Sequence, residues 1–451
     1  MIKDVFTTAD IKLPHEDSME VWSVIACDQF SSEREYWERV KAQTGSNPST
    51  LNMIIPEAYL GEIDEETATK NICNAMEAYS NQDILREISD SFVYTERTLG
   101  DGSVRRGLVG AVDLDEYEFS GGDAAILASE ATVLDRLPAR IRIRRAAQLE
   151  VPHIMAFIND INKTVIEPLT SLAIENLPVL YDFDLMESGG HIKGWQVTGT
   201  YAETILEAMR ALHSKDRTLM VIGDGNHSLA AAKVFWNELK QTLSPEERAS
   251  HPARKTLLEV NNVYDPAISF EAIHRVVFNV DSSDFISAFS ELLSVDLLLS
   301  LNDPPNLQLD RSSGSRFSGN PLAKDSPSQE KIADKFLIQS KVRNYPLRWI
   351  ASTQADLFNV TADCIGDVID VVQSFIDDYS KRNNCEIDYI HGEASVKKLA
   401  SLENCVGIIL PAMDKSDLFA TVKTTGIFPR KSFSVGHAKD KRYYLECRSI
   451  K

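Results

Sequence analysis

The sequence predicts a mixed α/β fold, and three of its features lead to this prediction. Short apolar runs typical of strands alternate with segments whose apolar residues recur at helical spacing. Two pairs of strand-like runs are joined by glycine-containing turns, as in β-hairpins. A strand-like run at 218–222 continues through two glycines into an alanine-rich helix. We therefore expect a mixed sheet with helices in the N-terminal part and a smaller α/β domain at the C-terminus.

The N-terminal part is predicted to alternate between strands and helices. An apolar run at 21–27 is interpreted as a strand that ends at Asp28, and a charged helix is expected near 33–42. Asp64 is placed to cap a second helix. The expected hairpins run from 91 to 112 and from 178 to 198, and further strands are expected at 256–263 and 272–280.

The chain changes character between Asn302 and Gln329, where Pro, Ser, Gly and Asn are frequent and large apolar residues are rare. This composition predicts a flexible loop or linker, and a functional lid is the alternative. The expected domains are residues 1–300 and 333–451, with the linker at 301–332. The second domain is expected to contain a helix over 365–379, strands at 387–390, 406–410 and 442–447, and helices near 394–402 and 414–423.

Composition limits the kinds of partner and compartment that we expect. The 451 residues are 43% hydrophobic and 25% charged, with a formal net charge of −20. Such an acidic protein repels phosphate backbones and anionic lipids, so neither nucleic acid nor a membrane is expected as a partner. The chain shows no membrane-spanning apolar run, no signal peptide and no Cys-x-x-Cys pair among its six cysteines. A cytoplasmic protein with reduced thiols is therefore expected.

The run from Gly223 to Ser228 is the strongest candidate for a binding site. Gly223 and Gly225 allow positive φ and a close backbone approach, and the following helix, expected at 228–240, presents free N–H groups to an anion. Asp224 and His227 add a carboxylate and an imidazole that could hold a metal or move a proton. The alternative is a plain tight turn in which Asn226 or Asp224 caps the helix.

Five arginines lie between Arg136 and Arg145 in this acidic chain. If the segment is extended, Arg140, Arg142 and Arg144 lie on one face, where guanidinium groups suit a phosphate or carboxylate. If it is helical, the same arginines form a solvated face that pairs with carboxylates.

Three further candidates are weaker. His274 and Arg275 stand at the start of a predicted strand, where they could contact an anionic ligand. Asp28 follows an apolar strand, and open α/β sheets bind ligands at strand ends. The basic run at 430–432 is interpreted as a surface patch.

Taken in order, these residues resemble the domain of unknown function 1015 family of bacterial and archaeal proteins, over nearly the whole chain. Asp28 matches the early aspartate of the family. The family's Asp-Gly-His-His-Arg turn corresponds here to Asp224–Ser228, and its His-Glu-Arg-Thr-like segment with the arginine that follows corresponds to Ser129–Thr132 with Arg136. Its Thr-His-Arg corresponds to Ile273–Arg275, and its Pro-Lys-Ser to Pro429–Ser432. Asn226 replaces the first histidine of the turn and Ser228 its arginine, which removes a guanidinium suited to phosphate.

A more distant resemblance extends to the ParB-like fold, which includes a free serine kinase. It implies a ParB-like mixed sheet and a nucleotide-dependent kinase that acts on the hydroxyl of a small molecule such as an amino acid. Glu130 is then the candidate base, the 223–228 turn binds phosphate, and Asp224 or His227 assists with metal or proton. Mg²⁺ with ATP or ADP is the expected cofactor, and no built-in metal is predicted.

Two other functions stay open. The protein could bind a nucleotide or phosphorylated metabolite without catalysis. It could also be a metal-dependent hydrolase that uses Asp224, His227 and Glu130, although no His-x-His or His-Glu-x-x-His pattern is present. Both kinase and hydrolase require folding to bring Glu130 and His227 together, and the sequence alone does not show this.

Overall fold

The protein has the mixed α/β class that was predicted, and its computed structural model describes residues 4–15, 19–134, 137–302, 343–352, 354–424 and 426–451. The chain forms two compact units. The first comprises residues 1–274, 389–392 and 410–451, and the second comprises residues 275–388 and 393–409. This division differs from the expected one at 300 and 333, because the C-terminal residues return to the first unit. Residues 303–332 of the expected linker lie outside the described residues.

The first unit is built on an eleven-stranded mixed sheet with the order β5-β6-β11-β8-β12-β4-β3-β10-β9, to which β1 and β2 are added through β4 and β3. Both predicted hairpins are confirmed, since β3 pairs antiparallel with β4 and β9 with β10. The strands are β1 Phe6–Thr7, β2 Ala9–Pro14, β3 Leu85–Thr98, β4 Val104–Asp113, β5 Tyr117–Glu118, β6 Ile126–Ala128, β8 Met155–Ile158, β9 Val179–Asp184, β10 His191–Val197, β11 Met220–Asp224 and β12 Lys255–Asn262.

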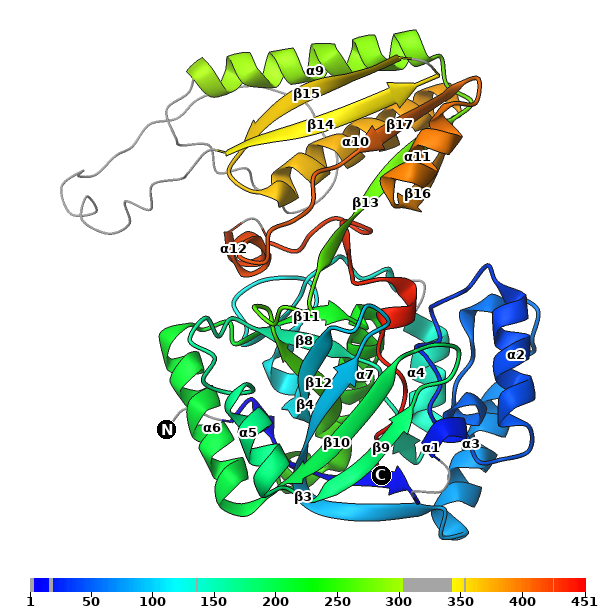
Figure 1. Cartoon of the computed structure of the whole chain (residues 1–451), viewed down its shortest axis with the longest axis vertical. Helices are drawn as coiled ribbons and strands as arrows, with labels where there is room; N and C mark the ends of the chain where they lie inside the picture. The colour runs from blue at the N-terminus through cyan, green and yellow to red at the C-terminus, as the bar shows by residue number, and fades with distance from the viewer. Residues whose placement is uncertain (1–3, 16–18, 135–136, 303–342, 353, 425) are drawn as a thin grey trace, which may run out of the picture. The chain divides into compact units, whose positions relative to one another are not determined.

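Helices cover both faces of this sheet (Figure 1). Along β4 the side chains alternate, with Leu108 and Val112 in the core beside α6 and α7, and Val109 and Ala111 in the core beside α2. The helices of the unit are α1 Met19–Trp22, α2 Arg34–Thr44, α3 Glu65–Asn81, α4 Leu137–Ala146, α5 Pro168–Glu175, α6 Gly199–Lys215, α7 Asn226–Leu239, α8 Pro245–Ser250 and α12 Asp417–Thr424. None of the helices within the described ranges is long and apolar enough to cross a membrane.

The Asp64 cap is as predicted, whereas the strand predicted nearest the N-terminus is not. The Asp64 carboxylate accepts a hydrogen bond from the Thr67 N–H at 2.9 Å and caps α3 as expected. The predicted strand at 21–27 is wrong, because the short helix α1 ends there and only Ile25 forms an isolated bridge, with Tyr443. An apolar run is equally compatible with a strand and with a buried helix. Here the residues are apolar because they are buried, and not because they form a strand.

The second unit is a smaller sheet in which β13 (Phe270–Phe278), β17 (Cys405–Ile409), β14 (Arg343–Ala351) and β15 (Gln354–Ala362) are neighbours. The predicted stripe at 365–379 forms α10 (Ile365–Asn383), and its Phe375 packs against Phe285 and Phe289 of α9 (Ser282–Asn302). The remaining elements are β16 Glu386–His391 and α11 Glu393–Ala400, and Figure 1 shows α9 and α10 lying along the long strands of this unit.

The C-terminal segment, residues 437–450, runs through the interior of the first unit. It contains little regular strand, since only Arg448–Ser449 (β19) pairs with Leu149–Glu150 (β7), so the predicted strand at 442–447 is replaced by extended chain with isolated bridges. Side chains hold its carbonyl groups instead. Arg97 donates to the carbonyl oxygens of residues 439, 440 and 441, and Trp22 donates to that of residue 445 at 2.9 Å.

Arg442 anchors this segment with a buried guanidinium group. Its Nε donates to Glu259 at 2.8 Å, Nη2 donates to Glu446 at 2.5 Å, and Nη1 donates to the carbonyl oxygen of Pro152 at 2.6 Å. Arg442 is only 4% exposed and Glu446 only 1%. Buried charges of this kind persist because each is paired and hydrogen-bonded.

We predict that Arg442→Met destabilises the protein by about 3–5 kcal/mol, because it removes the cationic partner of buried Glu446 and leaves buried Glu259 only Arg105, 4.0 Å away. Chemical denaturation followed by circular dichroism measures this loss. The control is Lys439→Met, which removes an exposed cation from the same segment and is expected to change the free energy of unfolding by less than about 0.5 kcal/mol. Equal effects of the two variants would contradict an anchoring role for Arg442.

Candidate functional site

The predicted strand–turn–helix geometry is present at residues 220–228. β11 ends at Asp224, Gly225 has φ 81°, and α7 begins at Asn226 without a side-chain cap. Gly223 is required for packing, since a Cβ atom there would lie 2.1 Å from the ring of Phe157. The turn from Gly223 to Ser228 is half-buried. The first N–H groups of α7 are therefore not capped by a side chain, as an anion-binding turn requires.

The segment that carries Glu130 lies beside this turn. β6, which ends at Ala128, runs parallel to β11, so both chains leave the sheet at the same edge. The Asn226 amide donates to the hydroxyl of Ser129 at 3.2 Å, and the His227 ring accepts a hydrogen bond from the Val133 N–H at 3.1 Å. Folding thus brings the Glu130 segment and His227 together.

Glu130 itself is held by the chain that follows Phe428. Its carboxylate accepts hydrogen bonds from the N–H groups of Lys431, Ser432 and Phe433 at 3.3, 2.9 and 3.3 Å. Burial raises the pKa of Glu130, and these N–H groups oppose the rise. The basic run at 430–432, interpreted from the sequence as a surface patch, therefore also contacts Glu130 through its main chain.

Asp224 faces Lys441, a residue of the C-terminal segment that lies beside the turn. The Lys441 ammonium lies 3.5 Å from Oδ2 of Asp224 and is largely buried. Oδ2 of Asp224, Oδ1 of Asn226 and the hydroxyl of Thr132 are buried atoms without a hydrogen-bond partner in the part of the chain that the structure describes. Buried oxygens without a hydrogen bond need a donor or a cation nearby, and for Asp224 the ammonium of Lys441 already supplies one. Oxygen ligands are those that Mg²⁺ prefers.

No cluster of three or more His, Cys, Asp or Glu side chains that could hold a metal occurs among the described residues. The two oxygens of Asp224 and Asn226 thus supply only part of a coordination shell.

Asp28 and His153 are two further titratable residues that interact with each other and with Lys441 or Asp224. Burial works against the charge of Asp28, but His153, Gln29, Lys441 and Arg140 outweigh it and lower the pKa of Asp28. Burial lowers the pKa of His153, although Asp28 and Asp224 oppose this. The His153 ring also packs edge-on against Tyr444, with centroids 5.1 Å apart. Asp28 thus lies in the candidate site, as a charged carboxylate beside a mainly neutral imidazole.

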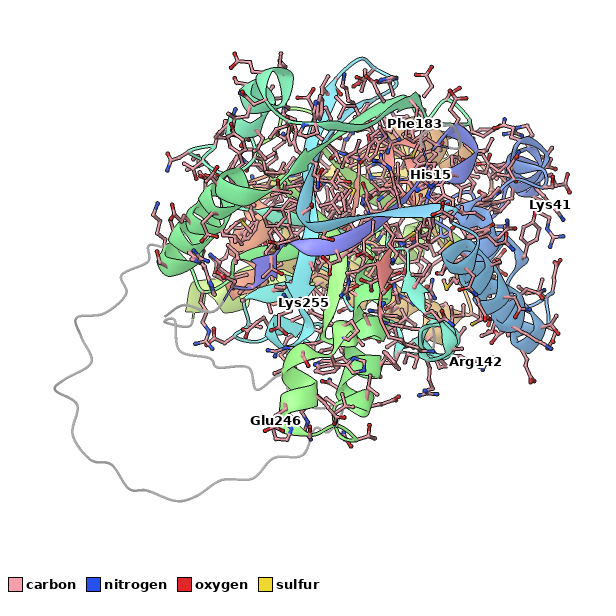
Figure 2. All side chains as sticks on the ribbon, turned by 90° about the horizontal axis from the view of Figure 1, so that it is seen from below. His15, Lys41, Arg142, Phe183, Glu246 and Lys255 are labelled. Atoms are coloured by element: carbon pink, nitrogen blue, oxygen red, sulfur yellow. The ribbon has the colours of Figure 1, made fainter. Side chains whose placement is uncertain are left out.

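The arginine segment is helical, so the extended arrangement is wrong. It forms α4, and each of the arginines from 140 to 145 pairs with a carboxylate, as the alternative expected. The solvated face holds only in part, since the side chain of Arg144 is just 13% exposed. Arg142 bonds to Glu65 at 2.8 Å and is half-exposed, near the outer edge of the view in Figure 2. Arg144 bonds to Glu150 at 2.6 Å. The predicted ligand residue Arg136 lies outside the described residues.

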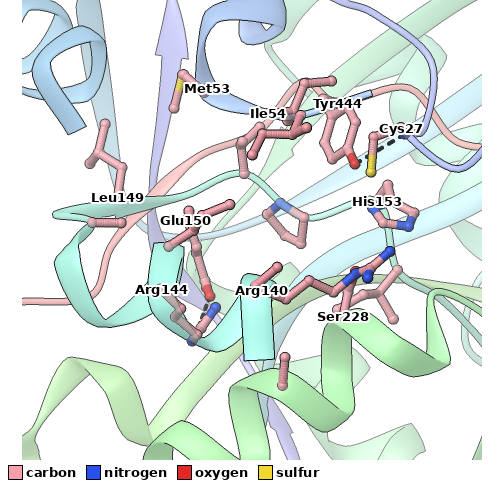
Figure 3. Close-up of a pocket in the computed structure, with 18 of the residues that line it drawn as sticks. Cys27, Met53, Ile54, Arg140, Arg144, Leu149, Glu150, His153, Ser228 and Tyr444 are labelled. Carbon is pink, nitrogen blue, oxygen red and sulfur yellow. Dashed lines mark hydrogen bonds and ion pairs between the residues drawn. The ribbon is translucent and has the colours of Figure 1, made fainter. Parts of the chain in front are cut away.

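Arg140 is the arginine that reaches the turn. It pairs with Glu57, and α4 packs against α7 through Leu137, Ala230 and Ala231. A cavity of about 170 Å³ lies between these helices and is lined by Arg140, His153, Ser228 and Tyr444 together with apolar residues. Figure 3 shows the Arg140 guanidinium extending toward His153 and Ser228.

His274 and Arg275 have partners elsewhere. Both lie in β13; the ring of His274 accepts a hydrogen bond from the Leu410 N–H at 3.3 Å, and the guanidinium of Arg275 donates to Gln373 at 3.1 Å. Both side chains are buried. The two residues therefore contribute to packing, and their predicted role in ligand binding stays a prediction.

His153, Lys441 and Tyr444 were not singled out from the sequence. Each carries a polar group at the turn, yet none lies in a recognisable motif. Lys441 and Tyr444 lie more than 200 positions from the turn, and only the path of the C-terminal segment brings them there. The available signal was that the Lys441-Arg442 pair directly precedes the short apolar run Tyr443–Leu445.

Comparison with known proteins gives a family and several distant structures. Residues 7–362 match the model of a family described as protein of unknown function, DUF1015. No curated protein matches the chain. A free serine kinase variant in complex with AMP shares 9% identity over 74% of this chain and 90% of its own, with a TM-score of 0.36.

Two further solved structures are similar at the same level. SbnI with a C-terminal truncation from Staphylococcus aureus shares 8% identity over 73% of this chain and 82% of its own, with a TM-score of 0.33. A conserved hypothetical protein from Pyrococcus furiosus shares 10% identity over 74% and 92%, with a TM-score of 0.32. The free serine kinase to which the sequence pointed is thus among the similar structures.

We predict that His153 makes stability depend on pH below 6.5, the ordinary pKa of histidine. Because its folded-state pKa is lowered, the unfolded chain takes up a proton first, so stability is complete above pH 6.5 and decreases as the pH falls through the folded-state value. The loss is at most about 1.4 kcal/mol per pH unit. Urea denaturation at pH 7.5 and pH 5.0 should show a smaller decrease for His153→Gln than for the wild type.

The matched control is His15→Gln, which alters an exposed histidine and should keep the wild-type pH dependence. An unchanged decrease in His153→Gln would show that the imidazole of His153 is not held neutral by burial.

Proposed function

The chain belongs to the DUF1015 family of proteins of unknown function, and we propose that it binds a nucleotide phosphate at the start of α7 and transfers a phosphoryl group to a small hydroxyl compound. One observation carries this proposal. The uncapped first turn of α7 is approached by cationic or polar side chains from three other segments, namely Arg140, His153 and Lys441.

The charges around the turn suit a phosphate ligand. The N–H groups of residues 226–228 and the helix dipole favour an anion. Lys441 and Arg140 add positive charge, and both are already paired with Asp224 and Glu57. A phosphate with its own Mg²⁺ would exchange these pairs for equivalent ones, so the net charge of the site would change little.

Mg²⁺ bound with the nucleotide would neutralise negative charge on the phosphates. The buried oxygens of Asp224 and Asn226 are suitable ligands for it, since both lack a hydrogen-bond partner within the described residues.

Glu130 is the candidate base toward the acceptor hydroxyl. Burial raises its pKa, and a general base works best when its pKa is near the working pH. The three N–H groups of residues 431–433 fix the direction of its carboxylate. The position of Glu130 beside the turn would place an acceptor close to a bound phosphate.

Non-catalytic binding is the second candidate function. The same three N–H groups that orient Glu130 also occupy its lone pairs, which leaves less capacity to accept a proton. A protein that only senses a nucleotide or phosphometabolite requires the anion site and not a free base.

We predict that ATP or ADP with Mg²⁺ stabilises the wild type, by about 2.7 kcal/mol at a hundredfold excess over Kd. Lys441→Met removes a cation from the anion site and should weaken nucleotide binding about tenfold or more. Isothermal titration calorimetry measures both affinities. Lys439→Met removes a cation of the same segment outside the site and should bind like the wild type, so equal weakening by the two variants would contradict a specific role for Lys441.

We predict turnover when the protein is incubated with ATP or ADP, Mg²⁺ and a pool of small hydroxyl compounds that includes serine. Glu130→Gln keeps the size of the side chain and should lower kcat by about 10²–10⁴-fold while leaving nucleotide affinity within about twofold. Phosphorus NMR of the mixture measures product. Nucleotide binding without any consumption would favour the sensing function, and full activity of Glu130→Gln would exclude Glu130 as the base.

A further inference from the structure

We propose that the cavity beside the first turn of α7 receives an apolar group, the size of one ring or a short branched alkyl chain, carried by the acceptor molecule. This inference rests on the proposed function, because it assumes that an anionic or phosphorylated group binds at the turn. It names the class of acceptor as a small molecule with a polar end and an apolar end.

One end of the cavity lies at the turn and is polar. Ser228 in the first turn of α7, Arg140 of α4 and His153 lie together at that end, as Figure 3 shows. Leu149 and Met53 lie at the opposite side in the same view. Met76, Ile143 and Val151 are among the other apolar side chains of the wall.

The charged groups that also line the cavity are neutralised by one another. Glu150 is paired with Arg144 at 2.6 Å, and Glu57 is paired with Arg140. The thiol of Cys27 is neutral at physiological pH, since burial raises its pKa to about 12. A polar substituent buried against Met and Ile side chains would lack a partner and cost about 1–3 kcal/mol. The cavity therefore selects for an apolar group.

The volume is suited to a single ring. The cavity measures about 170 Å³, and an apolar cavity of about 150 Å³ in another protein binds benzene. A nucleobase carries several hydrogen-bonding atoms around its edge, which this wall would leave unpaired. The acceptor is therefore a better occupant than the base of the nucleotide.

Two alanines leave space beside Ile143. Ala139 and Ile143 lie on α4, and Ala147 directly follows its last residue, with its N–H bonded to the Ile143 carbonyl at 2.8 Å. The three residues are spaced four apart, and all line the cavity. Ala147 is buried, whereas the neighbouring Ala146 is exposed. Ala147→Leu should fill part of the cavity, and Ala146→Leu makes the same change where it points to solvent.

The test is isothermal titration calorimetry of the full chain with three probes. Phenyl phosphate carries an anion and a ring, inorganic phosphate carries the anion alone, and AMP carries a nucleobase. Phenyl phosphate should bind the wild type at least tenfold more tightly than inorganic phosphate. Ala147→Leu should remove this advantage and leave the Kd of inorganic phosphate and of AMP within twofold, while Ala146→Leu should leave all three affinities unchanged.

A second variant keeps the test informative if Ala147→Leu fails to fold. Met53→Ala enlarges the apolar end and should improve the binding of 2-naphthyl phosphate relative to phenyl phosphate by fivefold or more.

The possible failures are distinguishable. If inorganic phosphate and AMP bind but phenyl phosphate has no advantage, the cavity does not select an apolar group and the proposed function is unaffected. If Ala147→Leu weakens AMP as much as phenyl phosphate, the cavity holds the nucleobase and the inference is wrong. If none of the three probes binds, the anion site itself is absent, and the proposed function falls together with the inference.

Discussion

The structure of the first unit depends on buried guanidinium groups that hold the C-terminal segment inside it. Arg97 and Arg105 donate to main-chain carbonyl groups of residues 439–441, and Arg442 joins the segment to Glu259 of β12. A segment with so little regular pairing would otherwise bury carbonyl groups without donors, which is costly. Lys441 lies within this anchored run, and Tyr444 lies between Arg442 and residue 445, whose carbonyl accepts a hydrogen bond from Trp22. The same interactions therefore set the positions of both residues at the candidate site.

The candidate site combines charges of both signs in a partly buried place. Asp28 and Asp224 face Arg140, Lys441 and the largely neutral His153, and Glu130 is held by the N–H groups of residues 431–433, so most charges already have a partner without a ligand. A site of this kind has little net charge, yet it retains buried oxygens without a hydrogen-bond partner among the described residues and a first turn of α7 without a side-chain cap. We propose that these features, rather than an excess of positive charge, are what a phosphate with its cation would use.

Local patterns predicted those parts of the fold that local chemistry determines. The hairpins, the Asp64 cap, the apolar stripe of α10 and the turn at Gly225 follow from turn residues and periodicity. The arginine segment was ambiguous because alternating Arg and Ile fits a strand, while a helix that packs on α7 buries Ile141 and Ile143 partly and pairs the arginines with carboxylates. Lys441 and His153 could not be predicted, since no local sequence pattern marks them. The path of the folded chain brings these residues, which are distant in sequence, to the turn.

A crystal structure of the protein with AMP bound tests the central claim most directly. The expected result is a phosphate within hydrogen-bond distance of the N–H groups of residues 226–228, with Lys441 or Arg140 in contact with it. A phosphate bound elsewhere, with the first turn of α7 closed by protein atoms alone, would contradict the assignment of an anion site to this turn.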